Sequence, residues 1–482
     1  MISNIVKYTQ INSESNLLRL DSEFYSKELM DYDCNIKKAG FNKLGELLDV
    51  LTDYTANGSF ASLAKNVTVK DEKDYAKWIR IQNLDNYNYE DDIRYVDKCS
   101  YEFLKKSVLH GNELLISKTG EYLGKCYIFN PTDQYKYTLA DNIFLLKLKD
   151  RKYDNFIYSY INSEIGRKLL LRYSQGTGQP TIIKENLREL KIPKVSDKYL
   201  NKISEVINER FYLINESNKN YNLAREMLNS EIVPKNFVFS DNNSTIKKFG
   251  EIDNNTKRID SEYYQEKYFQ LDEIIEDKSK KLIEIVDIEK SIDPGSDCYV
   301  DNSNESAIPF IRISNLSYKG LSNDYIYVDK SRIKNIDKLF IKKDDILLSK
   351  DGSVGIAYNM QNDFDGILCG GILRLKIKDK TIVTQEYLTL ILNSKLVKMQ
   401  AERDCGGSIL EHWKKEQIEN IKIPIISYEK QIDISEKIKL SFKQLEKSNI
   451  LLENVKKAIR ILVYEGENKS LELLQKCFFL EL

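Results

Sequence analysis

The sequence is poor in the residues and motifs that carry out catalysis. It holds only two histidines, His110 and His412, in 482 residues, whereas zinc sites and histidine-based triads usually need more. It contains neither a GxxxxGK[ST] phosphate loop nor a GxGxxG turn that opens a helix. Residues 120–125 (GEYLGK) have the wrong spacing for a phosphate loop, and residues 130–133 (NPTD) lack the aromatic residue with which adenine methyltransferases stack a flipped base. We therefore predict a protein that is not an enzyme and has no catalytic residues and no metal ligands.

Disulfide pairing and membrane insertion are also not indicated. The seven cysteines lie far apart and form no CxxC pair, a pattern typical of reduced cytoplasmic thiols. No run of about eighteen apolar residues is present, and the first residues lack the apolar core and cleavage site of a signal peptide. We expect a cytoplasmic protein.

An excess of charge of one sign is missing as well. The chain has 73 basic and 74 acidic residues, for a net charge of −1, so the strongly basic balance of many nucleic-acid-binding proteins is absent. A neutral total still permits a basic cleft that faces acidic outer surfaces. The length predicts two to four domains.

What the sequence does contain is an internal repeat. Five segments of the first half return in order in the second half, at a spacing that stays at roughly 230 to 240 residues. The matched pairs are 19–25 (RLDSEFY) with 258–264 (RIDSEYY), 78–84 with 310–316, 95–97 with 327–329, 115–118 (LISK) with 347–350 (LLSK), and 187–193 (LRELKIP) with 418–424 (IENIKIP). Chance would scatter these spacings, so the pattern indicates a duplication.

Each copy is predicted to have a globular part of mixed helix and strand. Short apolar runs such as 78–84, 114–117 and 143–148 are separated by Gly, Asn and Asp turns and indicate strands. A helical stretch follows at about 154–174 and 384–402, so the fold class is α+β. Lys-Ile-Pro closes each globular part with a strand that does not continue into a helix.

A long helix follows each globular part. In both copies seven positions step by four and three residues, a spacing of 3.5 that is typical of a coiled coil; the alternative is an ordinary amphipathic helix packed on its own domain. The two series are Ile207, Phe211, Ile214, Asn218, Tyr221, Arg225 and Leu228, and Ile438, Phe442, Leu445, Asn449, Leu452, Lys456 and Ile459. Asn218 and Asn449 are the fourth of seven layers, so an antiparallel pairing would join two amides in mid-seam and fix the register. A helix of ~36 residues spans ~54 Å, about one and a half turns of B-DNA.

The expected organisation is therefore two tandem globular domains joined by two long helices in an antiparallel coiled coil. The predicted boundaries are 1–39 for an N-terminal segment and helix, 40–195 for the first globular domain, 196–232 for the first long helix, 233–281 for a linker and a short helix, 282–426 for the second globular domain, 427–465 for the second long helix, and 466–482 for a helical tail.

The chain resembles the specificity (S) subunit of Type I restriction–modification systems. Residues 176–182 (GTGQPTI) followed by 187–193 (LRELKIP) are similar to the end of that family's recognition domain, and the turn after 114–118 (LLISK) also fits. The second copy departs at 406–410 (GGSIL), which lacks the Gln-Pro pair. The resemblance covers nearly the whole chain.

The resemblance implies function and partners. Family members bind double-stranded DNA at a two-part asymmetric sequence with a fixed spacer, and the two helices act as the ruler. They assemble with two copies of an adenine methyltransferase subunit that uses S-adenosylmethionine. A nuclease/translocase subunit that uses ATP and Mg²⁺ is often present, and the S subunit itself needs no cofactor.

The repeat also separates candidate DNA-binding residues into two groups. Residues shared at matched positions suit scaffold roles or phosphate contacts; these are Arg80, Arg312, Lys118 and Lys350. Base reading is expected where the copies diverge, at 52–77 and 291–309, 119–138 and 351–367, and 173–184 and 403–415. The candidates there are Asn57, Lys65, Lys70, Lys125, Gln175, Thr177 and Gln179 in the first copy, and Asn302, Asn304, Arg403 and Lys414 in the second.

Two other functions remain open at this stage. The chain would be the recognition part of a single-chain restriction or methylation enzyme if it held a catalytic motif. It would be a scaffold of the same fold if it bound partners without reading sequence.

Overall fold

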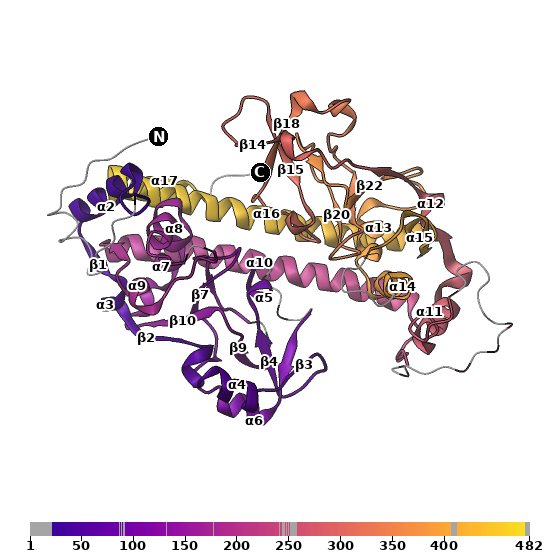
Figure 1. Ribbon diagram of the computed structural model, residues 1–482, viewed down its shortest axis with the longest axis horizontal. Coiled ribbons are helices and arrows are strands. Elements are labelled where there is room, and N and C mark those ends of the chain that lie inside the picture. The colour runs from indigo at the N-terminus through magenta and orange to yellow at the C-terminus, as the bar shows by residue number, and fades with distance from the viewer. Residues whose placement is uncertain are drawn as a thin grey trace. The chain divides into compact units, whose positions relative to one another are not determined.

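A computed structural model of the chain describes residues 22–85, 87, 89, 92–131, 133–176, 178–240, 242, 246, 248, 250, 258–405 and 412–477. The chain divides into two compact units (Figure 1): unit 1 consists of Met1–Glu216 and Gln444–Leu482, and unit 2 of Ser217–Lys443. Each unit thus contains one globular copy and part of both long helices. Among the described residues, every helix is too short or too polar to cross a bilayer.

Unit 1 contains a four-stranded antiparallel sheet and a five-stranded mixed sheet. The first sheet has the order β2 (Leu48–Asp53), β10 (Ile143–Leu148), β7 (Leu114–Ser117) and β8 (Cys126–Ile128). The second has the order β3 (Val69–Lys70), β5 (Arg94–Val96), β4 (Ala76–Ile79), β9 (Lys136–Leu139) and β6 (Val108–Leu109), in which β4 and β9 are parallel.

Unit 2 repeats this topology except for the edge strand β6. Its first sheet has the order β13 (Val286–Lys290), β22 (Ile372–Ile377), β19 (Ile346–Ser349) and β20 (Ala357–Asn359). Its second has the order β14 (Tyr299–Val300), β18 (Ile326–Asp329), β15 (Ala307–Ile311) and β21 (Ile367–Leu368), and β15 is parallel to β21. A small hairpin of β16 (Leu316–Ser317) and β17 (Gly320–Leu321) is added. The shared strand order confirms the duplication and the α+β class.

The Lys-Ile-Pro segments are strands, as predicted. In unit 1, β11 (Lys191–Pro193) pairs with β1 (Phe41–Lys43), and in unit 2, β23 (Lys422–Pro424) pairs with β12 (Ser279–Lys281). Each strand ends one globular copy and lies antiparallel to the strand that begins it.

Helices fill the rest of each copy. Those of unit 1 are α2 (Lys27–Ala39), α3 (Leu44–Leu47), α4 (Phe60–Asn66), α5 (Ile81–Asp85), α6 (Lys98–Phe103), α7 (Asp154–Asn162), α8 (Glu164–Leu171) and α9 (Lys184–Arg188). Those of unit 2 are α11 (Glu266–Ile275), α12 (Leu282–Ile285), α13 (Gln385–Leu392), α14 (Lys395–Cys405) and α15 (Lys415–Glu419).

Two sequence-based predictions are corrected here. The predicted helix at 154–174 is two helices, because the Ser163 hydroxyl ends one and caps the next by accepting a hydrogen bond from the Gly166 N–H at 3.1 Å. The predicted strand at 78–84 ends at Ile79 and continues as α5, because the Asn83 side chain bonds the backbone of Arg80 at 3.1 Å and starts a helical turn.

The central strand β10 is almost wholly apolar because both of its faces are buried. Phe144, Leu146 and Leu148 belong to a core shared with the helices. Ile143 and Leu145 belong to a second core shared with the five-stranded sheet. Alternate side chains of a strand point to opposite faces, so one strand serves two cores.

The long helices are α10 (Asp197–Ile232), of 36 residues, and α16 (Tyr428–Glu465), of 38 residues; α17 (Glu467–Lys476) follows. Within unit 2 they run antiparallel: the Ser217 and Ser441 hydroxyls lie 3.0 Å apart, and Glu231 pairs with Lys430 at 3.2 Å. Within unit 1, the Tyr199 hydroxyl at the start of α10 lies 2.7 Å from the Ser470 hydroxyl of α17.

The seam residues differ from the prediction by one position in both helices. Ile207, Ile214, Tyr221 and Leu228 are buried as predicted, but the alternate layers are occupied by their neighbours. The buried residues are Ser217 and Ala224 in α10 and Ser441, Ser448 and Val455 in α16, in place of Asn218, Arg225, Phe442, Asn449 and Lys456; Phe211 is buried as well, beside buried Arg210.

The predicted asparagine register is therefore wrong. Asn449 is exposed and Asn218 only half-buried, with its amide oxygen accepting a hydrogen bond from Lys319 at 2.8 Å. Phe211 and Phe442 fit the predicted spacing, but their apolar side chains serve another contact. Their rings pack on Tyr158 and Tyr358 of the globular copies, at 5.8 Å and 5.9 Å between centroids.

Candidate DNA interface

The arginine shared between the copies is part of a scaffold. In unit 1, Arg80 pairs with the carboxylate of Asp92 at 3.0 Å and bonds its carbonyl. The Asn83 amide also donates to the Asp92 carbonyl, at 3.4 Å. The two side chains therefore hold the loop that follows α5.

The same arrangement occurs in unit 2. Asn315 accepts from the Arg312 backbone at 2.9 Å and donates to the Asp324 carbonyl at 3.1 Å, while the Arg312 guanidinium donates to that carbonyl at 3.4 Å. Of the two roles predicted for Arg80 and Arg312, the structure favours the scaffold over the phosphate contact.

Lys118 lies in a buried ion cluster. Its ammonium group is 3.0 Å from Asp53, which also binds Lys184 at 2.8 Å. Burial raises the pKa of Asp53, but the hydrogen bonds from Lys184 and Lys118 outweigh it, and the net effect is a lowered pKa. Only 14% of the Lys118 side chain is exposed, and its charge is neutralised inside the domain by Asp53.

The matched residue of unit 2 is held differently. Lys350 pairs with its neighbour Asp351 at 2.6 Å, and the same carboxylate bonds the ring of His412. Lys350 and Lys118 have the same low side-chain exposure, 14%. Neither lysine is therefore placed as an open phosphate ligand.

Two of the divergent loops are adjacent in each copy. In unit 1, Thr119 bridges to Thr181, and the Ile182 N–H donates to the Lys118 carbonyl at 3.0 Å. In unit 2, the Trp413 N–H donates to the Lys350 carbonyl at 2.8 Å. The turn after LISK or LLSK and the loop before the Lys-Ile-Pro strand thus form one surface in each copy.

On this surface, Gln175 and Gln179 are exposed in unit 1, and Lys414 is exposed in unit 2. The Gln175 backbone is fixed by paired hydrogen bonds to Thr181, at 2.8 and 2.9 Å, so the loop is anchored while its side chains stay in solvent. Thr177, a further candidate, lies outside the described residues, as do residues 406–411 of the second copy.

Four other candidates serve the fold. Asn57 bonds the Tyr54 carbonyl, the Ser107 hydroxyl and the Lys106 N–H, which uses both ends of its amide. The ammonium groups of two lysines and the guanidinium of Arg403 are taken up by carboxylates: Lys70 by Asp74, Lys125 by Asp85, and Arg403 by Asp272. The Lys70 and Lys125 side chains are 40% and 36% exposed, and base reading by these four residues stays a prediction.

Arg403 has a counterpart that sequence matching did not single out. The Arg172 guanidinium stacks on Phe24 at 3.9 Å and donates to its carbonyl, while the Arg403 guanidinium stacks on Tyr263 at 4.5 Å. This contact explains why the segment that contains Phe24 and Tyr263 is so well preserved between the copies: it fastens the start of each copy to the end of α8 or α14.

The remaining candidates are exposed, and one exposed residue was missed. Lys65, Asn302 and Asn304 lie on the surface. Phe60, the first residue of α4, is 74% exposed, although it is large and apolar. Asn57 fixes the turn before it, so Phe60 is held in solvent by a rigid support. An aromatic residue directly after the Gly-Ser pair of a divergent loop was the available sequence signal.

The matching family model and two curated relatives are described as Type I restriction specificity proteins. Residues 274–459 match the family model described as the Type I restriction modification DNA specificity domain. The chain is 24% identical over 460 residues to the putative type I restriction enzyme MjaX specificity subunit of Methanocaldococcus jannaschii, which covers 92% of this chain and 98% of that protein. It is 21% identical over 377 residues to the MjaVIII specificity subunit of the same organism, with 75% and 80% covered. A solved S subunit of a Type I restriction–modification system from M. genitalium is similar at 15% identity and a TM-score of 0.38, with 91% and 95% covered.

Proposed function

We propose that this chain, a member of the Type I restriction–modification specificity family, binds a two-part asymmetric DNA sequence and directs a partner adenine methyltransferase to it. One observation carries the proposal: two copies of one domain, with the same strand order, present different exposed loops on matched scaffolds. Two similar readers with different side chains suit a target whose halves differ in sequence.

The division between scaffold and reader follows from the contacts. Ion pairs and hydrogen bonds within the copies occupy the charged groups of Arg80, Arg312, Lys118 and Lys350. Base reading is assigned instead to the exposed side chains of the divergent loops. These are Phe60, Lys65, Gln175 and Gln179 in unit 1, and Asn302, Asn304 and Lys414 in unit 2. Amides suit adenine edges, lysine suits guanine, and an apolar ring suits the thymine methyl group.

The chemistry is assigned to the partners. Two copies of the methyltransferase subunit would each carry S-adenosylmethionine, and a nuclease/translocase subunit, where the system has one, would carry ATP and Mg²⁺. Within this proposal the chain supplies sequence recognition and the distance between half-sites, and α10 and α16 set that distance.

The test is methylation-motif sequencing of a host that carries the chain with its methyltransferase. We expect a two-part motif with a fixed spacer. A methyltransferase complex that enriches no motif would show a scaffold, and purified chain that cuts or methylates DNA alone would show a single-chain enzyme.

Phe60 and Gln179 provide a sharper test of the readers. Phe60→Ala and Gln179→Ala should each change or relax the motif at the half-site of unit 1 and leave the other half-site intact, because both residues belong to the copy in unit 1 and are exposed there. A loss of about 1–3 kcal/mol is expected at the position read. Lys118→Ala serves as the scaffold control. Where this variant folds, the methylation motif of its complex should be the same as that of the wild type.

A further inference from the structure

The segment between β18 and β19 of unit 2 is strongly basic, although the whole chain is neutral. Residues 330–343 (KSRIKNIDKLFIKK) hold six basic residues and one acidic residue, whereas the net charge of the chain is −1. All six basic side chains are exposed: Lys330, Arg332, Lys334, Lys338, Lys342 and Lys343. Positive charge is therefore concentrated on one short stretch of surface.

Most of this charge is not neutralised locally. Among the residues that the structure describes, no carboxylate forms an ion pair with Lys334, Lys338 or Lys343, and the same holds for Lys330. Arg332 pairs with Asp329 at 3.3 Å. Lys342 pairs with Asp363 at 3.6 Å, and both of these side chains are more than half exposed. An exposed pair such as Lys342–Asp363 contributes little and exchanges readily for other anions.

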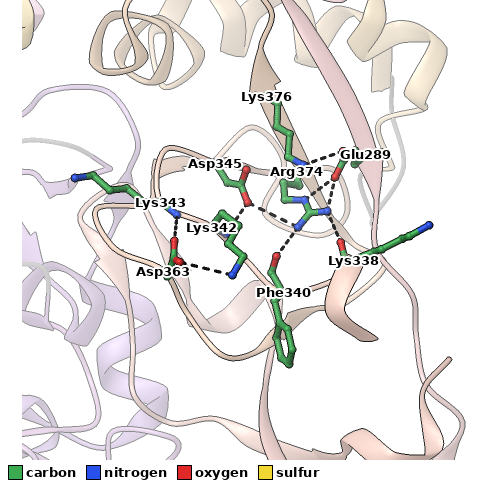
Figure 2. Close-up of polar contacts among 9 residues, drawn as sticks. All are labelled: Glu289, Lys338, Phe340, Lys342, Lys343, Asp345, Asp363, Arg374 and Lys376. Atoms are coloured by element: carbon green, nitrogen blue, oxygen red, sulfur yellow. Dashed lines mark hydrogen bonds and ion pairs between the residues drawn. The ribbon is translucent and has the colours of Figure 1, made fainter. Parts of the chain in front are cut away.

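A buried arginine fastens the backbone of this segment. Arg374 of β22 donates to the carbonyls of Phe340 at 2.6 Å and Lys338 at 2.7 Å, and its Nε donates to Glu289 at 2.8 Å. Lys376 adds a bond to Glu289 at 3.0 Å. Figure 2 shows the side chains of Lys338 and Lys343 extending away from this cluster, so the network fixes the main chain and leaves the ammonium groups outside.

The next turn of the segment is fixed in the same way. The backbone N–H of Lys342 donates to Asp345, and that of Lys343 to Asp363, both at 2.8 Å (Figure 2). Ordering of a flexible loop usually costs binding energy. Here the folded domain has already fixed the backbone that presents the lysines.

The matched segment of unit 1 lacks this arrangement. Residues 98–111 have the same length but only three lysines and one glutamate. Lys106 donates to the Ala56 carbonyl at 2.9 Å. Buried Leu145 occupies the strand position that corresponds to Arg374, because Ile143 pairs with Ser117 as Ile372 pairs with Ser349. The basic surface is a feature of the second copy.

The segment also contacts a loop assigned to base reading. Arg332 donates to the carbonyl of Asp297 within the divergent stretch 291–309, and β14 of that stretch pairs with β18 directly before the segment. A rigid, exposed run of lysines beside a reading loop has the chemistry of a phosphate contact.

We propose that segment 330–343 binds the DNA phosphate backbone beside the half-site read by unit 2 and supplies much of the sequence-independent attraction. The inference rests on the proposed function. It implies that the two copies contribute unequally: the second attracts DNA of any sequence more strongly than the first.

The test compares two double variants of the full chain in complex with its methyltransferase. Lys338→Gln with Lys343→Gln removes two segment charges. Lys280→Gln with Lys281→Gln, on exposed residues of β12 in the same unit, removes two charges elsewhere. Duplex binding is measured against salt concentration on the cognate site and on random DNA.

Each lost phosphate contact should lower the salt slope by about 0.9 and the affinity by about five-fold at 0.15 M salt. The segment variant should therefore lose about 25-fold affinity on both duplexes and keep its methylation motif, while the β12 variant binds as the wild type does.

Three outcomes would overturn the inference: an unchanged salt slope, an equal loss in the β12 variant, or loss of the methyltransferase from the purified complex, which would indicate an acidic protein surface as the ligand. A wild-type complex that enriches no motif would refute the proposed function instead, so the two failures are distinguishable.

Discussion

Replacement of Asp53 should lower the stability of unit 1. Its buried carboxylate accepts hydrogen bonds from Lys118 at 3.0 Å, Lys184 at 2.8 Å, the Thr55 hydroxyl at 3.0 Å and the Ala56 N–H at 3.1 Å. Asp53→Asn keeps the shape and removes the charge, so two ammonium groups would face a neutral amide.

The cost follows from the exposure of the two lysines. Removal of one partner from a fully buried ion pair costs about 3–5 kcal/mol. The Lys118 and Lys184 side chains are 14% and 29% exposed, so water partly solvates them in the variant, and we expect a loss of about 2–3 kcal/mol. For a unit of this size, that loss lowers the Tm by about 4–12 °C.

The matched control is Asp71→Asn, which breaks an exposed pair in the same unit. Asp71 lies 3.1 Å from Arg94, and its side chain is 83% exposed, so the variant should shift stability by less than about 1 kcal/mol. Calorimetry or urea unfolding of the full chain at pH 7 measures both. Equal shifts for the two variants would refute the claim that burial makes the Asp53 cluster important.

The pH dependence provides a second check on Asp53. The pKa of Asp53 is lowered in the folded state, so its contribution is present above the unfolded value of about 3.9 and is lost as pH falls through the folded pKa. The difference between wild type and Asp53→Asn should therefore be full at pH 7 and shrink below about pH 4. A difference that does not depend on pH would point to lost packing instead of lost charge.

Two further changes test other parts of the structure. Burial raises the pKa of Asp404 to about 6, so wild-type stability should fall by up to about 3 kcal/mol as pH rises from about 4 to above 6, and Asp404→Asn should remove that fall. Urea unfolding of both proteins at pH 5 and pH 7.5 measures the effect. A stability difference between the two proteins that is the same at both pH values would contradict it. Ser448 is fully buried in the helix seam and Asn449 is exposed. Ser448→Leu should therefore lower the stability by about 1–3 kcal/mol through overpacking, whereas Asn449→Ala should stay within about 0.5 kcal/mol of wild type. Thermal unfolding measures both variants, and a larger loss for Asn449→Ala would support the asparagine register.

The sequence predicted the elements whose signals are local. The Lys-Ile-Pro strands, β7 and β10 were identified because an apolar run bounded by turn residues needs little else to be recognised. The two long helices were identified because their periodicity extends over many turns.

The sequence could not decide which of two neighbouring apolar rows faces the partner helix. Phe211 and Phe442 looked like seam residues, yet their rings pack on the globular copies, while Ser441 lies 3.0 Å from Ser217 of the other long helix. A helix that contacts both a second helix and a domain has two buried stripes one residue apart, and hydrophobicity alone does not distinguish them.

The duplication itself, and the separation of shared from divergent residues, came from the sequence alone, because repeated segments are visible without a structure. Only the tertiary structure decided which polar side chains are available to a ligand. Asn57, Lys125 and Arg403 have the right chemistry for reading DNA but bond partners 3 to 131 residues away within their own unit. The charge of a side chain is a property of its residue type, whereas its availability depends on what the fold places beside it.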